Sequence, residues 1–290
     1  MSQPDKRLLF HVGAHVTGTR QVQRYLRENA EPLRMQGVHY IQRELMSKYV
    51  GWGPKVVLDP RPLAREISQA MRSPGIGDVV ASHENTIGRP FVEGGGGLYA
   101  GAGPALEAIA ALAEPYRCTV VLSVCSQANF LESFYLHTVN GGVWDSFETW
   151  LDERSLDDIS WLPLHEQLVE IFGADDVRVL DYESVGADAG AYVREFFRLL
   201  DLDLPTDHVP PVRLFRHSEK ALSVALAANP YLKAPDERAG LRTFLAESFS
   251  GRNYAPATLL TAEQRASLEA RYRDEYLRVV GHEPVGEVRE

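Results

Sequence analysis

The residues whose types and spacing could do chemistry lie first in residues 13–19, a glycine- and threonine-bearing turn near the amino terminus. The apolar run before this turn predicts a buried strand, and the residues after it have a helical pattern. Such an arrangement directs free backbone N–H groups and a helix N-terminus at an anion. Gly13 and Gly18 would let the backbone bend. Thr17 and Thr19 could donate hydroxyls to phosphate oxygens, or could simply cap the helix of an ordinary turn.

The sequence around this turn is more specific than the turn itself. HVGAHVTGTRQVQRYL at residues 11–26, with LRMQGVHYI at residues 33–41, resembles the opening of the bacterial sulfotransferase family. The resemblance implies that this strand, turn and helix hold the 5′-phosphosulfate of PAPS (3′-phosphoadenosine-5′-phosphosulfate). The family turn reads G-x-x-K-T-G-T or -S, and Val16 stands where the family has its catalytic lysine. The implied donor contacts are Gly13, Ala14, His15, Thr17, Gly18 and Thr19.

A second segment, TVVLSVCSQANFLESFYLHTV at residues 119–139, resembles the strand and helix that bind the 3′-phosphate in this family. The family pattern is an apolar strand, then Arg-x-Gln, then a helix with a serine ahead of a tyrosine. Gln127, Ser133 and Tyr135 fit this pattern, and the resemblance implies that Gln127 and Ser133 contact the donor. Cys125 stands where the family has the arginine.

Two cations of the family's donor site are therefore replaced, and other basic residues are candidates to compensate. Arg20 falls in the first turn of the predicted helix and is the best local substitute for the lysine, although its residue type and position favour a solvated surface arginine slightly more. Arg213, Arg216 and Lys220 follow a pair of prolines. These three could supply the missing contacts or only solvate the start of a helix.

The general base that the resemblance implies would lie at the end of another strand. Residues 78–82 predict a buried strand that is followed by His83 and Glu84. A base needs hydrogen-bond reach and a suitable pKa, so Glu84 is the first candidate and His83 the second. Glu84 could instead cap the next segment or pair with an arginine. His11, inside the first strand, is interpreted as a core histidine.

Composition limits the class of protein. The 290 residues are 44% hydrophobic and 24% charged, which is typical of a globular chain with a large core. A net charge of −10 argues against nucleic acid as a partner. No apolar run reaches membrane-spanning length, and the first residues lack a signal-peptide core, so the cytoplasm is the expected location. Cys118 and Cys125 lie too far apart on one predicted strand to form a disulfide, and no metal-ligand spacing is present.

Alternating strand and helix patterns predict a three-layer α/β/α fold with a mainly parallel central sheet, and the ligand at the carboxyl ends of the strands. Residues 1–205 are expected to form this core, and residues 206–290 a helical extension packed on the same domain. Residues 88–103 are rich in glycine and predict either a lid over an acceptor site or a surface loop. Further strands are expected at residues 37–41, 118–124 and 177–180, and helices at residues 61–72, 104–113, 127–138, 147–154, 161–172, 189–200, 217–228, 236–248 and 261–280.

Three functions remain open from the sequence. The first is an enzyme that transfers a sulfuryl group from PAPS to a hydroxyl or amine of a small-molecule or carbohydrate acceptor, with an atypical donor site and no metal. The second is the same scaffold used for a PAPS-independent reaction, and the third is a non-catalytic binding protein. A P-loop kinase or NTPase is disfavoured because the Gly-Lys-Ser/Thr of that motif is absent.

Overall fold

The computed structural model describes residues 6–49, 60–92, 96–185, 188–202, 217–251 and 253–281. The predicted boundary at residue 205, the two prolines beyond it, and Arg213 and Arg216 lie outside these ranges, as do residues 93–95 of the glycine-rich loop.

The centre of the fold is a five-stranded sheet in the order β2-β3-β1-β4-β5, with every recorded strand pair parallel. The strands are β1 (Arg7–Gly13), β2 (Val38–Ile41), β3 (Asp78–Ser82), β4 (Arg117–Val124) and β5 (Val177–Asp181). Most residues of β1, β3 and β4 are buried, as expected for a parallel sheet covered on both faces. The predicted α/β fold with a mainly parallel sheet is confirmed.

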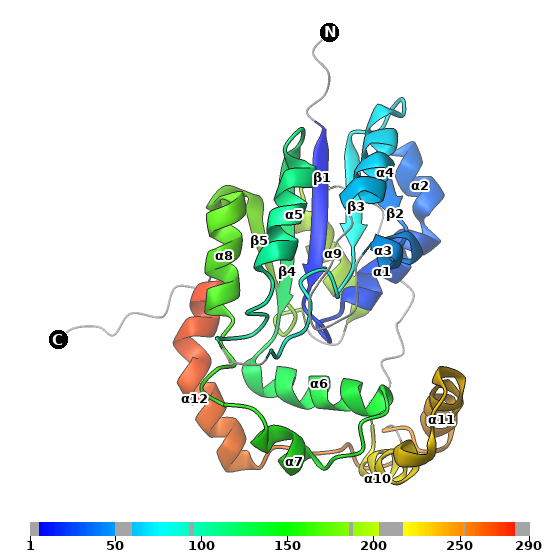
Figure 1. The fold of residues 1–290 in the computed structure, drawn as a ribbon, viewed down its shortest axis with the longest axis vertical. Coiled ribbons are helices and arrows are strands. Elements are labelled where there is room, and N and C mark those ends of the chain that lie inside the picture. Colours follow the sequence, from blue (N-terminus) through cyan, green and yellow to red (C-terminus); the bar gives the residue numbers. More distant parts are fainter. Residues whose placement is uncertain are drawn as a thin grey trace, which may run out of the picture. The chain divides into compact units, whose positions relative to one another are not determined.

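Helices cover both faces of the sheet (Figure 1). Helices α1 (Thr19–Glu28) and α9 (Ala189–Leu199) pack against each other over one face. Helices α4 (Pro60–Arg72), α5 (Gly103–Ala113) and α8 (Leu162–Phe172) form the layer on the other face, where α5 contacts both α4 and α8. The three layers follow from the apolar stripe of each helix, such as Leu63, Ile67, Ala70 and Met71 of α4, all of which are buried.

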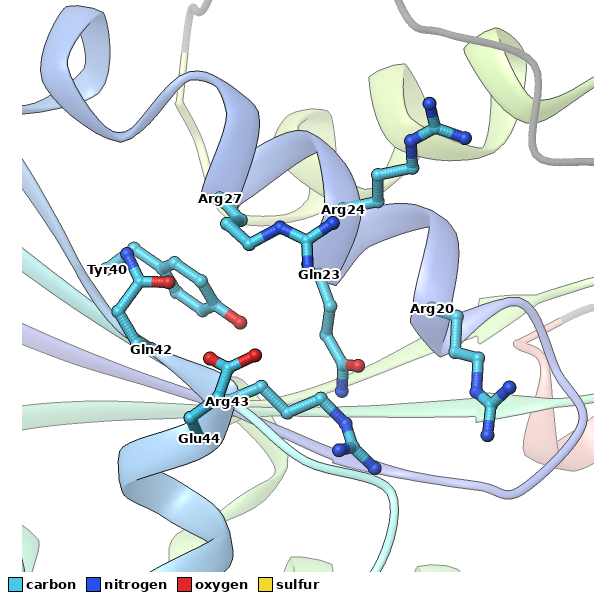
Figure 2. Close-up of a pocket in the computed structure, with 8 residues that line it drawn as sticks. All are labelled: Arg20, Gln23, Arg24, Arg27, Tyr40, Gln42, Arg43 and Glu44. Atoms are coloured by element: carbon cyan, nitrogen blue, oxygen red, sulfur yellow. The ribbon is translucent and has the colours of Figure 1, made fainter. Parts of the chain in front are cut away.

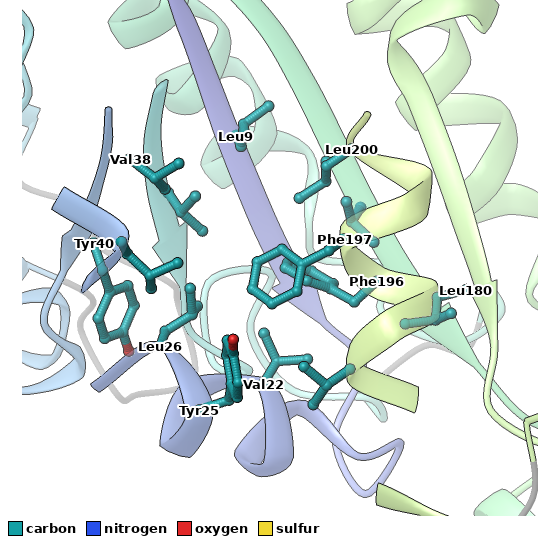
Figure 3. Close-up of a cluster of buried hydrophobic side chains, with 14 of the residues drawn as sticks. Leu9, Val22, Tyr25, Leu26, Val38, Tyr40, Leu180, Phe196, Phe197 and Leu200 are labelled. Atoms are coloured by element: carbon teal, nitrogen blue, oxygen red, sulfur yellow. The ribbon is translucent and has the colours of Figure 1, made fainter. Parts of the chain in front are cut away.

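Between α1, α9 and the sheet lies a cluster of buried hydrophobic side chains (Figure 3). Tyr25 meets Phe197 edge to face with ring centroids 5.4 Å apart, and Phe196 meets Phe197 in the same way. The ring of Phe196 also lies 5.0 Å from that of His11 in β1. This cluster fixes the position of α1, whose first turn follows the predicted anion-binding turn.

Two short helices between β1 and β3 were not predicted. Helix α2 (Ala30–Met35) follows α1, and α3 (Arg43–Tyr49) follows β2. Short helices lack the several turns of periodic pattern that a sequence analysis needs. Helix α3 begins at Arg43, and its first residues face α1 across a shared pocket.

The chain divides into two compact units. The first contains the sheet, its covering helices and the chain from Asp274 onward. The second comprises Ser126–Asp157 and Val212–Arg273, with α6 (Gln127–Asn140), α7 (Phe147–Asp152), α10 (Glu219–Ala228), α11 (Pro235–Ser248) and most of α12 (Ala262–Val279). Within it, Asn229 Nδ2 donates to the carbonyls of Val139 and Val143 at 2.8 and 2.7 Å.

No described helix is long and apolar enough to cross a membrane. Within the same residues, no group of three or more His, Cys, Asp or Glu could hold a metal ion. Cys118 and Cys125 are both free thiols.

We predict that Phe196→Ala destabilises the first unit strongly, because it opens a cavity at a side chain with no solvent exposure. The free energy of unfolding, measured by urea denaturation, should fall by about 3–5 kcal/mol. Met35→Ala is the matched control, since Met35 is 84% exposed and should cost less than about 0.5 kcal/mol. Equal losses in the two variants would contradict this description of the core.

Candidate functional site

The turn of residues 13–19 lies at the carboxyl end of β1, the central strand. The chain leaves β1 for β2 and β3 on one side and later continues through β4 and β5 on the other, so the switch point of the sheet falls here. Gly13 has φ 128°, and a Cβ at this position would lie 3.3 Å from the carbonyl oxygen of Glu84. The Ala14 N–H donates to the Ser123 carbonyl at 2.9 Å, which attaches the turn to β4.

The backbone of this turn presents N–H groups with no acceptor. Within the described part of the chain, no hydrogen bond is recorded for the N–H groups of residues 16, 18 and 19, and the Thr17 N–H faces the Ala14 carbonyl across a turn without reaching ordinary hydrogen-bond geometry. The N-cap of α1 is Gly18 in a left-handed conformation, and no side chain caps the helix. The hydroxyls of Thr17 and Thr19 donate instead to the Ala14 carbonyl, at 2.9 and 3.1 Å. Consecutive free N–H groups at a helix N-terminus form an anion-binding site.

Val16 occupies the most unusual position in the turn. It has φ 57°, a conformation that is costly for a β-branched residue, and its side chain is half-buried. Valine supplies neither a charge nor a hydrogen bond to a ligand. The strained backbone at this position is therefore held by its surroundings.

His15 is buried and fully engaged in a hydrogen-bond network. Its Nε2 lies 2.9 Å from Asn85 Oδ1, and its Nδ1 lies 2.8 Å from the Tyr99 hydroxyl. The same hydroxyl accepts the His15 backbone N–H at 2.9 Å. With Nε2 as the donor to Asn85, Nδ1 accepts the Tyr99 proton, and every group in the network is paired.

Tyr99 belongs to the glycine-rich loop, and the later part of that loop is packed rather than solvated. Leu98, Tyr99 and Ala102 are buried, and the N–H groups of Leu98 and Tyr99 donate to the carbonyls of Ser160 and Pro90. A lid role for residues 88–103 stays a prediction. Residues 98–102 are packed in place, and the Tyr99 hydroxyl supports the turn by its hydrogen bonds to His15.

Glu84 follows β3 beside the turn and is paired with a cation. Its two carboxylate oxygens accept from Arg43 Nη2 at 2.8 Å and from Gln23 Nε2 at 3.0 Å. Burial alone would raise the pKa of Glu84, but the hydrogen bond and charge of Arg43 and the hydrogen bond from Gln23 hold it well below its usual range. Glu84 is therefore ionised at neutral pH, and only a strongly acidic proton could be transferred to it.

His83 is buried and neutral. Burial lowers its pKa to about 4, against the opposing charge of Glu84. The Asn85 backbone N–H donates to Nδ1 at 3.1 Å, so Nε2 carries the proton and donates to Ser47 Oγ at 2.9 Å. Both ring nitrogens are thus used within the protein, which makes His83 the weaker candidate base of the two.

His11 is placed in the core, between hydroxyls. Its ring nitrogens lie 3.0 Å from Ser82 Oγ and 3.0 Å from Ser123 Oγ, and Ser123 Oγ lies 2.8 Å from the Tyr192 hydroxyl. Burial lowers the pKa of His11 to about 3. The interpretation of His11 as a satisfied core histidine agrees with this geometry.

The position of the family's 3′-phosphate arginine carries no positive charge here. Cys125 is buried, and its carbonyl accepts the Trp161 indole N–H at 2.9 Å. Burial first, and then the charges of Glu183 and Asp181, raise the pKa of the Cys125 thiol well above its usual value. The Tyr276 hydroxyl donates to Asp181 Oδ1 at 2.5 Å. The first unit therefore surrounds this position with aromatic groups and two carboxylates.

The other predicted donor contacts belong to the second unit. Gln127 is buried and Ser133 half-buried on α6, which begins after the N-cap Ser126. Their role as donor contacts stays a prediction. Lys220 on α10 lies over the rings of Phe249 and Tyr254, at 4.7 and 5.2 Å from their centroids.

Arg20 is exposed in the first turn of α1 and borders a pocket of about 270 Å³ (Figure 2). One wall of the pocket is a face of α1, and the other is the end of β2 with the start of α3. Sequence analysis did not find this pocket. The only feature of the sequence that pointed to this pocket is the spacing of the arginines on α1, and the same spacing is found on any solvent-exposed helix face. The lining residues are Arg20, Gln23, Arg24, Arg27, Tyr40, Gln42, Arg43 and Glu44.

No protein-family model matches this chain, and neither does any curated protein. Among solved structures, the chain is similar to a sulfotransferase from Alicyclobacillus acidocaldarius, with 16% identity, 98% of each chain covered and a TM-score of 0.45. It is also similar to a mouse sulfotransferase complexed with PAP, with 11% identity, 96% of this chain and 86% of that chain covered, and a TM-score of 0.42. A third similar structure is the sulfotransferase domain from the curacin biosynthetic pathway, with 11% identity, 94% and 99% coverage, and a TM-score of 0.34. What the site can bind is therefore argued from its own residues.

We predict that Gly18→Ala destabilises the protein because the turn has no room for a side chain. An added Cβ would lie 2.7 Å from Tyr182 Cε2 and 2.9 Å from Tyr192 Cζ. Gly173→Ala is a matched control, since Gly173 has a similar φ of 86° and no atom within 4 Å of an added Cβ. By thermal or urea unfolding, Gly18→Ala should cost about 1–3 kcal/mol more than Gly173→Ala. No difference between them would show that the turn is less closely packed.

We also predict that stability falls with acid in a way that depends on His11. Its pKa is about 3 in the folded protein against 6.5 ordinarily, so the unfolded chain takes up a proton first as the pH falls. The stabilisation is complete above pH 6.5 and is lost progressively toward pH 3. His11→Gln should reduce the slope of unfolding free energy against pH by about 1.4 kcal/mol per pH unit in the range of about pH 4–6. Met35→Ala, which leaves His11 and its surroundings intact, should retain the wild-type slope.

Proposed function

We propose that the turn of residues 16–19 binds the 5′-phosphosulfate end of a PAPS-type nucleotide, and that the protein is a sulfuryl transferase. The observation that carries this proposal is the set of N–H groups without acceptors at the carboxyl end of β1. Such groups strongly favour an anion with several acceptor oxygens. The resemblance of residues 11–41 to bacterial sulfotransferases selects phosphosulfate among such anions.

When bound, the nucleotide supplies a sulfuryl group: an acceptor oxygen or nitrogen forms a bond to sulfur, and the bond from sulfur to the bridging oxygen breaks, leaving its electron pair on the 5′-phosphate. The free N–H groups and the Arg20 guanidinium stabilise the negative charge that develops on that oxygen. Arg20 is the candidate for this role because it is in the first turn of α1 and has no ion-pair partner within the described residues. Removal of a single fixed donor of this kind typically lowers the reaction rate by roughly a hundred- to a thousand-fold.

The acceptor proton is proposed to pass to the Glu84 carboxylate. Glu84 is held beside the turn and remains ionised because of Arg43. A weak base is adequate here, because a hydroxyl becomes strongly acidic as its oxygen bonds to sulfur. In this role the Arg43 ion pair keeps the Glu84 carboxylate deprotonated before the reaction. Glu84 then accepts the acceptor's proton late, when the bond to sulfur is forming.

A second candidate is the same scaffold with a donor that lacks a 3′-phosphate. Cys125 replaces the family's arginine, and Asp181 and Glu183 are close enough to raise its pKa by their charge. A dianionic phosphate at this position would be repelled rather than bound. An adenosine 5′-phosphosulfate, or another anhydride with one anionic end, would avoid this repulsion.

Titration calorimetry with 3′-phosphoadenosine-5′-phosphate (PAP) and 5′-AMP tests both candidates. We expect the wild-type protein to bind PAP, and Arg20→Ala to weaken binding by about ten- to a hundred-fold, the loss of one charged hydrogen bond of about 1.5–3 kcal/mol. Arg34→Ala on α2 is the charge-matched control and should change affinity by less than about twofold, as expected for an exposed rim charge.

Absence of PAP binding at millimolar concentration would exclude the PAPS-type donor. Equal affinity for PAP and 5′-AMP would instead favour the second candidate, because it would mean that the 3′-phosphate makes no favourable contact.

A further inference from the structure

We propose that the pocket between α1 and the β2–α3 junction binds a small hydroxylated anion, such as a sugar that carries a carboxylate, phosphate or sulfate group. The proposal that the pocket binds such a ligand does not depend on the proposed function. The assignment of the pocket as the acceptor site does rest on the proposed function. Figure 2 shows Arg20, Gln23 and Arg27 projecting from one side of α1, and Tyr40, Gln42, Arg43 and Glu44 opposite them.

The positive charge of this pocket is only partly neutralised. Arg43 is paired with Glu84, and Arg24 is paired with Glu28 on the exposed side of the helix, both at 2.8 Å. For the guanidinium groups of Arg20 and Arg27, by contrast, no hydrogen bond or ion pair is recorded within the described residues. In a chain of net charge −10, two such arginines on one wall of a cavity are an exception. Their planar donor groups match carboxylate, phosphate and sulfate oxygens.

The floor of the pocket contains a polar group that lacks a well-aligned partner. Tyr40 is 5% exposed, and among the described residues its buried hydroxyl has no partner of ordinary hydrogen-bond geometry, although the Arg43 backbone N–H lies close enough to lower its pKa. In Figure 2 the Tyr40 hydroxyl points into the space between α1 and the start of α3. A buried hydroxyl without a well-aligned partner is unfavourable, and a ligand oxygen would supply one.

The hydroxyl of Tyr40 stays protonated and can act as a donor. Burial, together with the charge of Glu44, raises the pKa of Tyr40 above its usual value. The amides of Gln23 and Gln42 line the same space and can each donate and accept. These groups suit a ligand with several hydroxyls around its anionic group, rather than an inorganic ion that arginines alone would hold.

The size of the pocket restricts the ligand. Its volume of about 270 Å³ is at the lower limit of ordinary ligand sites. A single sugar ring with one charged group is an appropriate occupant, whereas a nucleotide would need more room.

The pocket is contiguous with the turn through shared residues. Arg20 borders the pocket and belongs to the helix turn that follows Gly18. Gln23 and Arg43 line the pocket and both hydrogen-bond Glu84, whose backbone lies against Gly13. Gln23 and Arg43 thus lie between the pocket and Glu84. The assignment as the acceptor site requires a ligand hydroxyl to reach Glu84 past these two side chains.

Calorimetry with defined sugars tests this site. The probes are glucuronate, glucose 6-phosphate and glucose 6-sulfate, with uncharged glucose as the ligand control. At least one anionic sugar should bind the wild-type protein and glucose should not, and the three anions identify which acidic group is preferred. Arg27→Ala should weaken that binding by about tenfold or more, and Tyr40→Phe by about threefold or more.

Arg27 is chosen because it lies seven residues beyond Arg20, about 10 Å along the helix axis, and is exposed. Its loss should leave PAP affinity and the melting temperature unchanged, which separates this site from the turn. Arg34→Ala is the charge-matched control for the sugar probes as well, and should preserve their affinity.

The inference is overturned if no anionic sugar binds, if glucose binds as well as the anions, or if Arg34→Ala weakens binding as much as Arg27→Ala does. If an anionic sugar binds in an Arg27-dependent manner and PAP does not bind at all, the sugar site is supported and the PAPS-type donor is excluded. If PAP binds and no anionic sugar does, the donor site is supported and the sugar site is excluded.

Discussion

Folded proteins rarely leave backbone N–H groups without an acceptor, and the turn after β1 has several for which no acceptor is recorded among the residues that the structure describes. The rest of the first unit can be understood as support for that arrangement. Gly13 and Gly18 allow the backbone to follow it, and Val16 adopts a costly conformation within it. Tyr99, reached through His15, and the carbonyl of Ser123 hold it from two sides. A bound anion would supply acceptors for these groups together.

Charge is arranged around the turn in an unequal way. On the side of α1 and α3, Arg20 and Arg43 provide positive charge, and Glu84 is ionised between the turn and the pocket. On the side of β5, Cys125 is buried near Asp181 and Glu183. We infer from this arrangement a site for an anionic group at the turn and for an anionic ligand beside α1.

Much of the fold could be predicted from sequence, because buried parallel strands have continuous apolar runs and helices such as α1, α4 and α9 have clear amphipathic patterns. The same patterns placed the turn, and His83 and Glu84, at strand ends. The contacts between them could not be predicted. Arg43 lies on a short helix without a long periodic pattern, and its pairing with Glu84 joins residues 41 positions apart. The arginines of α1 have the spacing of any solvated helix face, so only the opposite wall at Tyr40 distinguishes a pocket.

The central claim is that the N–H groups of residues 16–19 are available to an anion. Backbone amide NMR of the ¹⁵N-labelled protein, titrated with PAP, observes these groups directly. The account predicts that the amide proton signals of residues 16–19 shift downfield and become slower to exchange with solvent as each N–H gains an acceptor, while those of α2, which follows the opposite end of α1, do not move. Unchanged signals for residues 16–19 at saturating PAP, or shifts confined to other parts of the chain, would contradict it.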